Sequence, residues 1–475
     1  MRLPRVATTV ALALTVPLLA TTAASAAPGS TTGGDRYFPD AGNGGYDVSH
    51  YGLRLRYDLG GRLDGTAVIT LEALTDLDTF SLDLRDLQAT TVLVDARKAS
   101  FTQTAAADGP EGVGRVGGEL AITPKHRLRQ GSTHLVTVVY GGTPGRPTDQ
   151  TDSLYGWVST DDGAFVANEP EGASTWFPVN DVPTDKATYD FVINVPEGST
   201  AVANGEPVGK PLTFRGRTTY LWHAEDPMAS YLATASIGNY TMSTQTGPHS
   251  LPIYNYVDED PYVDYEGAPV DDPAAGLAQQ PQMIAFLEGV FGTYPFSSFG
   301  AIVDDDLDPG YALETQTRPI YAGAPDEATV VHELAHQWVG DSVTLARWQD
   351  IWLNEGFATY AEWLWTESQS GPSVQQRFDD VMADPDADWT VLPADPGVQD
   401  LFAWAVYDRG AATLQALRAT IHDQAFFSLL KKWTTQHEGG NVTTEDFIAL
   451  AEEVSHQDLG AFFQTWLYTP AKPAR

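Results

Sequence analysis

Two histidines lie four residues apart around a glutamate in the segment HELAH, at His332, Glu333 and His336. In a helix, His332 and His336 lie one turn apart on one face, so both imidazoles can reach one metal ion at about 2.0–2.1 Å. Glu333 is turned by about 100° from His332, because a helix has about 3.6 residues per turn, and it is not expected to be a ligand. It is instead placed to act on water at the ion, which is the mechanism behind the H-E-x-x-H motif.

A third possible ligand follows on what the pattern predicts to be the next helix. Glu355 is separated from His336 by eighteen residues and lies in WLNEGFATYAEWLW, an aromatic-rich run in which packing alone does not explain a carboxylate. Two histidines, one glutamate and an open fourth position form the ligand set of a catalytic zinc site. A longer motif with a third histidine would need Gly at position 339 and His at position 342, but the chain has Val339 and Ser342. The other histidines are expected to be surface or structural residues.

The elements that must position these residues fall into two regions. From Tyr46 to about Tyr240, short alternating runs such as YGLRLRYDL and YDFVINV have the period of strands. Beyond Asp326, the apolar period lengthens to that of helices, as in GAATLQALRATI and TTEDFIALAEEV. We therefore predict a multidomain α+β fold, with an N-terminal antiparallel β domain followed by a mostly helical domain that carries the predicted metal ligands.

The helix that carries the two histidines is expected to begin at Pro325 to Glu327, because proline and carboxylates suit a first turn. It is expected to end near Gly340. We predict four segments along the chain: a signal peptide at residues 1–26, a flexible leader at 27–45, a β domain at 46–241 and a catalytic domain at 242–475. The leader is rich in Gly, Ser, Thr and Asp, which is typical of flexible segments.

The N-terminus has the layout of a secretory signal peptide. Arg2 and Arg5 precede an apolar run from Val6 to about Ala20, and the small residues Ala24–Ala26 follow. A membrane anchor is the alternative, but the run is short and rich in Ala and Thr. We expect cleavage near Ala26 and a secreted protein.

The amino-acid composition limits the classes of partner that the protein is expected to bind. The chain has 27 basic and 63 acidic residues and a net charge of −36. Such a surface repels nucleic acid and anionic membranes, so neither is an expected partner, and we expect a monomer. The chain has no cysteine, which leaves no disulfide or thiol chemistry to consider.

The motif residues and their surroundings resemble the zinc aminopeptidases grouped around aminopeptidase N and leukotriene hydrolase, which are gluzincins. The pattern H-E-x-x-H-x18-E matches at His332, Glu333, His336 and Glu355, inside HELAHQWVGD and WLNEGFATY. Three further segments also resemble segments of the family, namely EPEGASTWFPVNDVPTDKATYDFVINVP, YPFSSFGAIVDDD and VYDRGAATL. The resemblance therefore extends from about Tyr46 to the C-terminus. It implies a saddle-shaped β domain, a thermolysin-like catalytic domain and one zinc ion per chain. The family's large C-terminal helical-repeat domain is not expected here.

The resemblance also implies a role for individual residues. Glu314, in YALET, and Glu169, in ANEPEG, would bind the free α-amino group of a peptide substrate, and Ala312 lies in the same substrate-binding strand. Tyr407, in VYDRG, would donate a hydrogen bond to the oxyanion, and Glu333 would be the general base. The chemistry is consistent, because a carboxylate pair can orient an ammonium and a phenol can stabilise developing negative charge. The implied activity is removal of N-terminal residues from peptides.

The chain departs from the family pattern in this strand. Tyr311, Leu313 and Thr315 replace the Gly, Met and Asn of the family's G-x-M-E-N motif, and Asp341 stands where Asn is usual. Because Tyr311 and Thr315 could reshape the substrate-binding edge, a zinc endopeptidase of the same clan stays open as an alternative. An inactive binding protein that retains the fold is less favoured, since the predicted catalytic residues are all present. Epoxide hydrolysis, found in one branch of the family, is disfavoured by the expected export.

Overall fold

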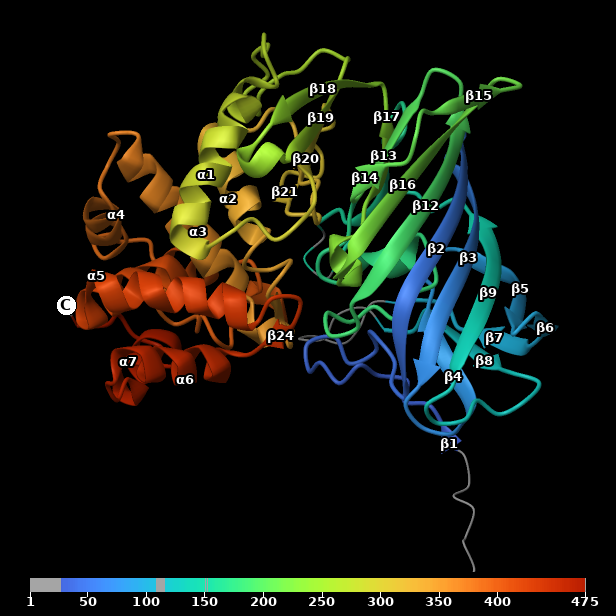
Figure 1. Cartoon of the computed structure of the whole chain (residues 1–475), viewed down its shortest axis with the longest axis horizontal. Coiled ribbons are helices and arrows are strands. Elements are labelled where there is room, and N and C mark those ends of the chain that lie inside the picture. The colour runs from blue at the N-terminus through green and yellow to red at the C-terminus, as the bar shows by residue number, and fades with distance from the viewer. Residues whose placement is uncertain (1–26, 108–115, 150, 152, 475) are drawn as a thin grey trace, which may run out of the picture.

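The computed structural model of the chain describes residues 27–107, 116–149, 151 and 153–474. A β-rich domain and a mostly helical domain lie side by side, with the N-terminal half of the chain forming the first and the C-terminal half the second (Figure 1). The predicted fold class is confirmed. The predicted signal peptide lies outside the described residues.

Alternation of buried and exposed side chains builds the central sheet of the β domain. In β2 (Tyr46–Asp58), Leu53 is buried and its neighbour Arg54 is exposed, as the strand pattern predicts. β2 pairs antiparallel with β3 (Arg62–Ala73) and parallel with β12 (Ala187–Pro196). The sheet order is β14-β16-β12-β2-β3-β9-β5-β6, with β15 paired to β16, and the other strands are β5 (Gln88–Val94), β6 (Arg97–Lys98), β9 (Thr133–Gly142), β14 (Glu206–Pro207), β15 (Leu212–Phe214) and β16 (Arg217–Met228).

Two four-stranded sheets complete this domain. The first has the order β1-β4-β8-β7, with β1 (Ala27–Pro28), β4 (Leu77–Asp83), β7 (Ser100–Gln103) and β8 (Glu119–Thr123). The second has the order β10-β11-β17-β13, with β10 (Gly156–Ser159), β11 (Ala164–Ala167), β13 (Thr200–Ala203) and β17 (Ala235–Gly238). Every residue of β11 is buried, and the chain that leaves this strand carries Glu169 toward the second domain.

The helical domain begins with a five-stranded sheet of order β18-β19-β20-β22-β21, formed by β18 (Tyr240–Thr246), β19 (Pro252–Asp258), β20 (Phe299–Asp304), β21 (Ala312–Leu313) and β22 (Ile320–Ala322). Its helices are α1 (Gln280–Phe291), α2 (Glu327–His336), α3 (Trp352–Ser368), α4 (Val374–Val381), α5 (Gly410–Gln436), α6 (Thr444–Ser455) and α7 (Gly460–Leu467), and β23 (Thr344–Leu345) pairs with β24 (Asn441–Val442). No array of helical repeats occurs among the described residues. None of the helices described combines the length and apolarity needed to span a bilayer.

Helix α2 begins where the sequence predicts and ends earlier. The carboxylate of Asp326 accepts a hydrogen bond from the backbone N–H of Thr329 at 2.8 Å, which caps the first turn. After His336 the pattern of helical backbone hydrogen bonds changes, because the N–H of Asp341 donates to the carbonyl of His336, five residues earlier, at 3.0 Å. Gly340 has a φ of +132°, which favours glycine at this turn. The expected end near Gly340 is therefore the end of this turn rather than of the helix.

The prediction of a flexible leader over residues 27–45 is wrong for the part that contacts the helical domain. Phe38 is 1% exposed, and its ring lies edge-on to that of Trp348 at 6.0 Å. The carboxylate of Asp35 accepts from the backbone N–H of Trp348 at 2.8 Å. The Gly-rich composition predicts flexibility, but these long-range contacts outweigh it.

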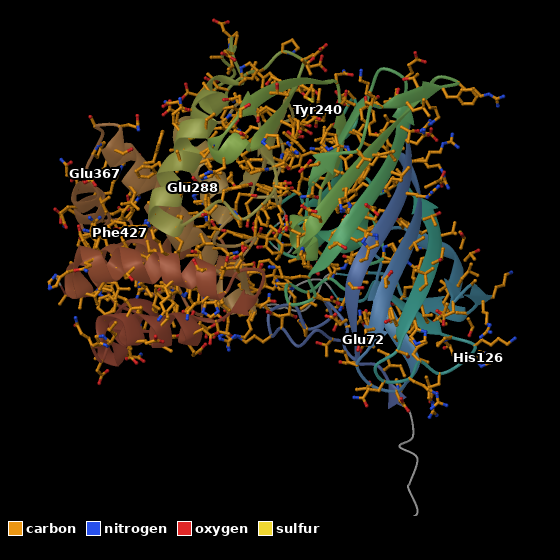
Figure 2. The ribbon with its side chains drawn as sticks, viewed as in Figure 1. Glu72, His126, Tyr240, Glu288, Glu367 and Phe427 are labelled. Carbon is orange, nitrogen blue, oxygen red and sulfur yellow. The ribbon has the colours of Figure 1, made fainter. Side chains whose placement is uncertain are left out.

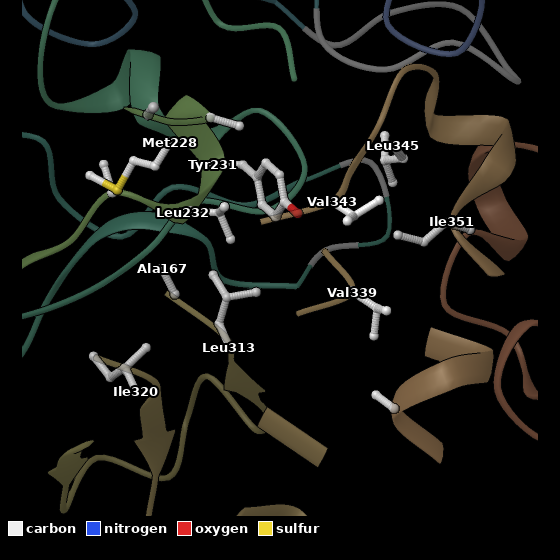
Figure 3. Close-up of a cluster of buried hydrophobic side chains, with 14 of the residues drawn as sticks. Ala167, Met228, Tyr231, Leu232, Leu313, Ile320, Val339, Val343, Leu345 and Ile351 are labelled. Atoms are coloured by element: carbon white, nitrogen blue, oxygen red, sulfur yellow. The ribbon is translucent and has the colours of Figure 1, made fainter. Parts of the chain in front are cut away.

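A cluster of buried apolar side chains joins the two domains. Tyr231 and Leu232 of the β domain lie in one cluster with Leu313 and Val343 of the helical domain (Figure 3). The hydroxyl of Tyr231 also donates to the carbonyl of Gly340 at 3.2 Å. Burial of this apolar surface favours one fixed arrangement of the domains.

Candidate active site

Helices α2 and α3 pack against each other and bring the three predicted metal ligands together. Nε2 of His332 lies 3.1 Å from Oε2 of Glu355, and Nε2 of His336 lies 3.4 Å from the same oxygen. The three donor atoms lie within 4.8 Å of one another on buried or nearly buried side chains. Two imidazole nitrogens and one carboxylate oxygen that converge in this way could hold a metal ion and fit a catalytic zinc site.

The second ring nitrogen of each histidine also has a partner. Nδ1 of His332 lies 2.5 Å from Oε1 of Glu362, and Nδ1 of His336 lies 3.0 Å from the carbonyl oxygen of Val339. Such contacts fix the orientation and tautomer of a ligating histidine. Glu362 is not among the residues predicted from the sequence. Its position seven residues after Glu355, on the same face of α3, is the signal that could have revealed it.

Replacing Glu362 by alanine is expected to weaken zinc binding by about 10- to 100-fold, because His332 would lose the carboxylate that orients it. Competition with a chromogenic chelator would measure the affinity. Glu362→Gln, which keeps an acceptor oxygen, should lose less than Glu362→Ala. An unchanged affinity in Glu362→Ala would show that the contact does not orient the ligand.

The electrostatics of the site favour positive charge at the imidazoles. Burial lowers the pKa of His336, but the carboxylates of Glu314 and Glu355 raise it to about 9. Burial raises the pKa of Glu355, but His336 and His332 lower it to about 2. A divalent cation bound by these side chains would supply the positive charge instead, with release of imidazole protons.

Glu333 lies beside the three ligands and is 5% exposed. One of its carboxylate oxygens lies within 4.8 Å of ligand atoms of Glu314 and His336. Burial raises the pKa of Glu333 to about 8, although His332 and His336 lower it. A carboxylate whose pKa is close to neutral can both accept and return a proton.

Glu169 and Glu314 approach the site from different domains. Glu169 follows β11 of the β domain, and Glu314 follows β21 of the helical domain. Their oxygens and one of Glu355 lie within 4.8 Å of one another. Oε1 of Glu169 and Oε1 of Glu314 are buried and accept no hydrogen bond from the described residues. Burial raises the pKa of both carboxyls, so the pair is suited to a ligand that brings positive charge and several donors.

Tyr407 completes the wall of the site. It lies in a π-helical turn, Ala405–Arg409, and its ring is stacked on that of His332 with centroids 6.0 Å apart. A cavity of about 310 Å³ opens beside it. All eight predicted site residues line this cavity. The complete lining is Asp149, Ser153, Leu154, Tyr155, Glu169, Tyr311, Ala312, Leu313, Glu314, Thr329, His332, Glu333, His336, Glu355, Phe402 and Tyr407.

The strand that departs from the family pattern is held in place. Tyr311 donates a hydrogen bond to the carbonyl of Leu154 at 2.7 Å, and its ring lies edge-on to Phe165 at 6.1 Å. The amide of Gln337 donates to the carbonyl of Glu314 at 3.2 Å, so α2 supports this strand directly. Gln337 is not among the residues predicted from the sequence, although it directly follows His336 in the motif segment.

The other histidines are scattered over the described residues, as predicted. His126, for example, is exposed at the far end of the β domain (Figure 2). The reactive histidine, glutamate and tyrosine side chains are therefore gathered at this one cavity. The fold and the site together are typical of zinc-dependent peptide-bond hydrolases.

Comparison with known families agrees with this class. The Peptidase M1 N-terminal domain matches residues 47–232, and the Peptidase family M1 domain matches residues 313–466. The chain belongs to peptidase family M1. Glutamyl aminopeptidase of Bos taurus is 28% identical over 332 residues, covering 64% of this chain and 34% of that protein. Aminopeptidase N of Streptomyces lividans is 26% identical over 358 residues, covering 68% of this chain and 40% of that protein. The chain thus spans well under half the length of these relatives.

Solved structures match over nearly the whole chain. The crystal structure of an M1 zinc metallopeptidase from Deinococcus radiodurans superposes with a TM-score of 0.81 at 27% identity, covering 93% of this chain and 98% of that chain. A mutant of that enzyme bound to a Tyr-Ser-Ala substrate gives a TM-score of 0.81 at 26% identity, covering 93% of this chain and 99% of that chain. The two-domain arrangement is therefore shared with a solved M1 metallopeptidase.

Proposed function

We propose that this protein is a zinc aminopeptidase that removes residues one at a time from the free N-terminus of peptides. The observation that carries the proposal is the buried pair Glu169 and Glu314, whose unpartnered oxygens lie beside the His332, His336 and Glu355 trio. A peptide ammonium supplies the positive charge and the three donors that this pair lacks. The similarity to proteins named glutamyl aminopeptidase and aminopeptidase N supports the same activity.

His332, His336 and Glu355 are the residues that would hold zinc. When bound there, zinc supplies Lewis-acid polarisation of the scissile carbonyl and lowers the pKa of water. Both histidines are already oriented by partners of their second ring nitrogens, so little rearrangement of them is needed for binding.

The remaining residues divide the steps of hydrolysis among them. Glu333 accepts a proton from the attacking water and gives it to the departing amine. Tyr407 donates a hydrogen bond to the oxyanion that develops on the carbonyl. Glu169 and Glu314 bind the α-ammonium and so fix the first peptide bond at the reacting centre. Ala312 lies on β21, the last strand in its sheet, where an unpaired edge can align the substrate backbone.

A pair of matched peptides tests this function. A peptide with a free N-terminus should lose residues successively from that end, whereas its N-acetylated counterpart should stay intact, because acetylation removes the ammonium. Glu314→Ala should cut activity on the free peptide by a large factor, since removing one partner of a buried charged contact costs about 2–5 kcal/mol. Mass spectrometry of the digests would follow both reactions.

The zinc content of Glu314→Ala provides the control, because Glu314 is not one of the proposed ligands. Internal cleavage of the acetylated peptide at a comparable rate would reject the aminopeptidase and support the zinc endopeptidase instead. Failure to cleave either peptide with zinc bound would reject both activities.

We also propose that the protein is exported and cleaved near Ala26. The basic start, the short apolar run and the small residues Ala24–Ala26 support this proposal. N-terminal sequencing of protein from the culture medium should begin near Ala27. Recovery of uncleaved protein only from cells would contradict it.

A further inference from the structure

Five carboxylates line the cavity, and the proposed function uses four of them. Glu169, Glu314, Glu333 and Glu355 have the roles of amine anchor, general base or metal ligand given above. The fifth is Asp149, and neither lysine nor arginine occurs among the lining residues. The cavity therefore contains one negative charge that the chemistry of peptide-bond hydrolysis does not require.

The side chain of Asp149 is fixed by its own loop. Its Oδ1 accepts from the N–H and hydroxyl of Thr151 at 2.7 and 2.8 Å and from the N–H of Ser153 at 3.1 Å. Oδ2 accepts no hydrogen bond from the described residues, and the side chain forms no ion pair with them. Arg146, the nearest basic residue in the sequence, is instead paired with Asp306 at 3.1 Å.

This carboxylate is also largely withdrawn from water. Asp149 is 7% exposed, and a charge so placed is costly unless a cation or several donors compensate it. Among the described residues these donors all reach Oδ1, which leaves Oδ2 available to a cationic group of a ligand in the cavity that Asp149 lines.

The walls beside Asp149 suit the stem of a long side chain. Leu154, Tyr311 and Phe402 line the same cavity. Tyr311 lines this cavity together with Asp149 and Glu169. Burial raises the pKa of Tyr311, and these two carboxylates raise it further. Apolar and aromatic walls pack against the methylene groups of arginine or lysine, and aromatic faces also attract a guanidinium.

We infer that the cavity binds the side chain of an N-terminal arginine or lysine and that Asp149 selects it through its cationic end. This inference rests on the proposed aminopeptidase function and names its substrate class. Glu169 and Glu314 bind the α-ammonium of such a substrate, while Oδ2 of Asp149 accepts from the guanidinium or side-chain ammonium.

Arginyl and citrullyl para-nitroanilides form a matched pair of substrates, because citrulline has nearly the shape of arginine without its charge. For the unaltered enzyme, kcat/KM should be about 10- to 100-fold higher for the arginyl substrate, as expected for a charge-assisted hydrogen bond. Asp149→Asn keeps an oxygen for the N–H groups of Thr151 and Ser153 and should bring this ratio close to one. Asp386→Asn, which removes the same charge from an exposed residue, should leave the ratio unchanged.

A second measurement needs no variant. Argininamide should inhibit hydrolysis of a leucyl substrate by the unaltered enzyme at a concentration about 10- to 100-fold lower than citrullinamide. Equal kcat/KM values for the two substrates, or an unchanged ratio in folded Asp149→Asn, would overturn the role of Asp149. Failure of the zinc-loaded enzyme to cleave leucyl, arginyl or citrullyl substrates would instead overturn the aminopeptidase function itself.

Discussion

Glu333→Gln is expected to lower turnover of a peptide substrate by about 10²- to 10⁴-fold while leaving the fold and the zinc content unchanged. Glutamine has nearly the shape of glutamate but cannot accept the proton of the attacking water. Glu333 is buried beside the ligand trio without belonging to it, so its replacement removes the base and keeps all three ligands. Steady-state kinetics together with elemental analysis would separate these two effects.

Glu327→Gln is a matched control for this substitution. Glu327 is the first residue of the same helix and is exposed, so its loss of charge should change turnover by less than a few-fold. Near-normal turnover in Glu333→Gln would mean that another group accepts the proton of the water.

His336→Ala is expected to reduce the zinc content from about one ion per chain to near zero and to abolish activity with it, because only two of the three protein ligands remain. A chelator should have the same effect on the unaltered protein and should also lower its thermal stability, since the bound metal stabilises the folded state. Elemental analysis and thermal unfolding, with and without added zinc, would measure both.

His126→Ala provides the matched control, because His126 is exposed at the far end of the β domain (Figure 2). It should retain zinc, activity and the stabilising effect of added metal. A His336→Ala protein that keeps about one zinc per chain at normal affinity would disprove the ligand assignment.

The convergence of side chains could be predicted from the sequence where helical spacing alone determines which residues meet. His332 and His336 lie one turn apart on α2, so their convergence follows from the period of a helix. The alternating strand pattern likewise predicted the buried face of β2. In both cases local geometry fixes the result.

The features that were missed depend on contacts between distant segments. The contact between Glu362 and His332 forms only because α3 packs on α2, and the leader is ordered by Asp35 and Phe38, which contact Trp348 more than three hundred residues later. A binding role for Asp149 can be inferred only because it lines the same cavity as residues of α2. No sequence period reports such pairings without homologous sequences or coordinates.

Glu169 and Glu314, the proposed ammonium-binding pair, come from different domains, and this has a consequence for how the protein would lose activity on heating. All three predicted metal ligands belong to α2 and α3, whereas Glu169 comes from the β domain. Slight undocking of the domains during heating would thus spare the metal and separate Glu169 from Glu314. Inactivation would then precede both zinc release and global unfolding. The proposed aminopeptidase activity would thus report on domain docking, and the zinc content would report on the integrity of the helical domain alone.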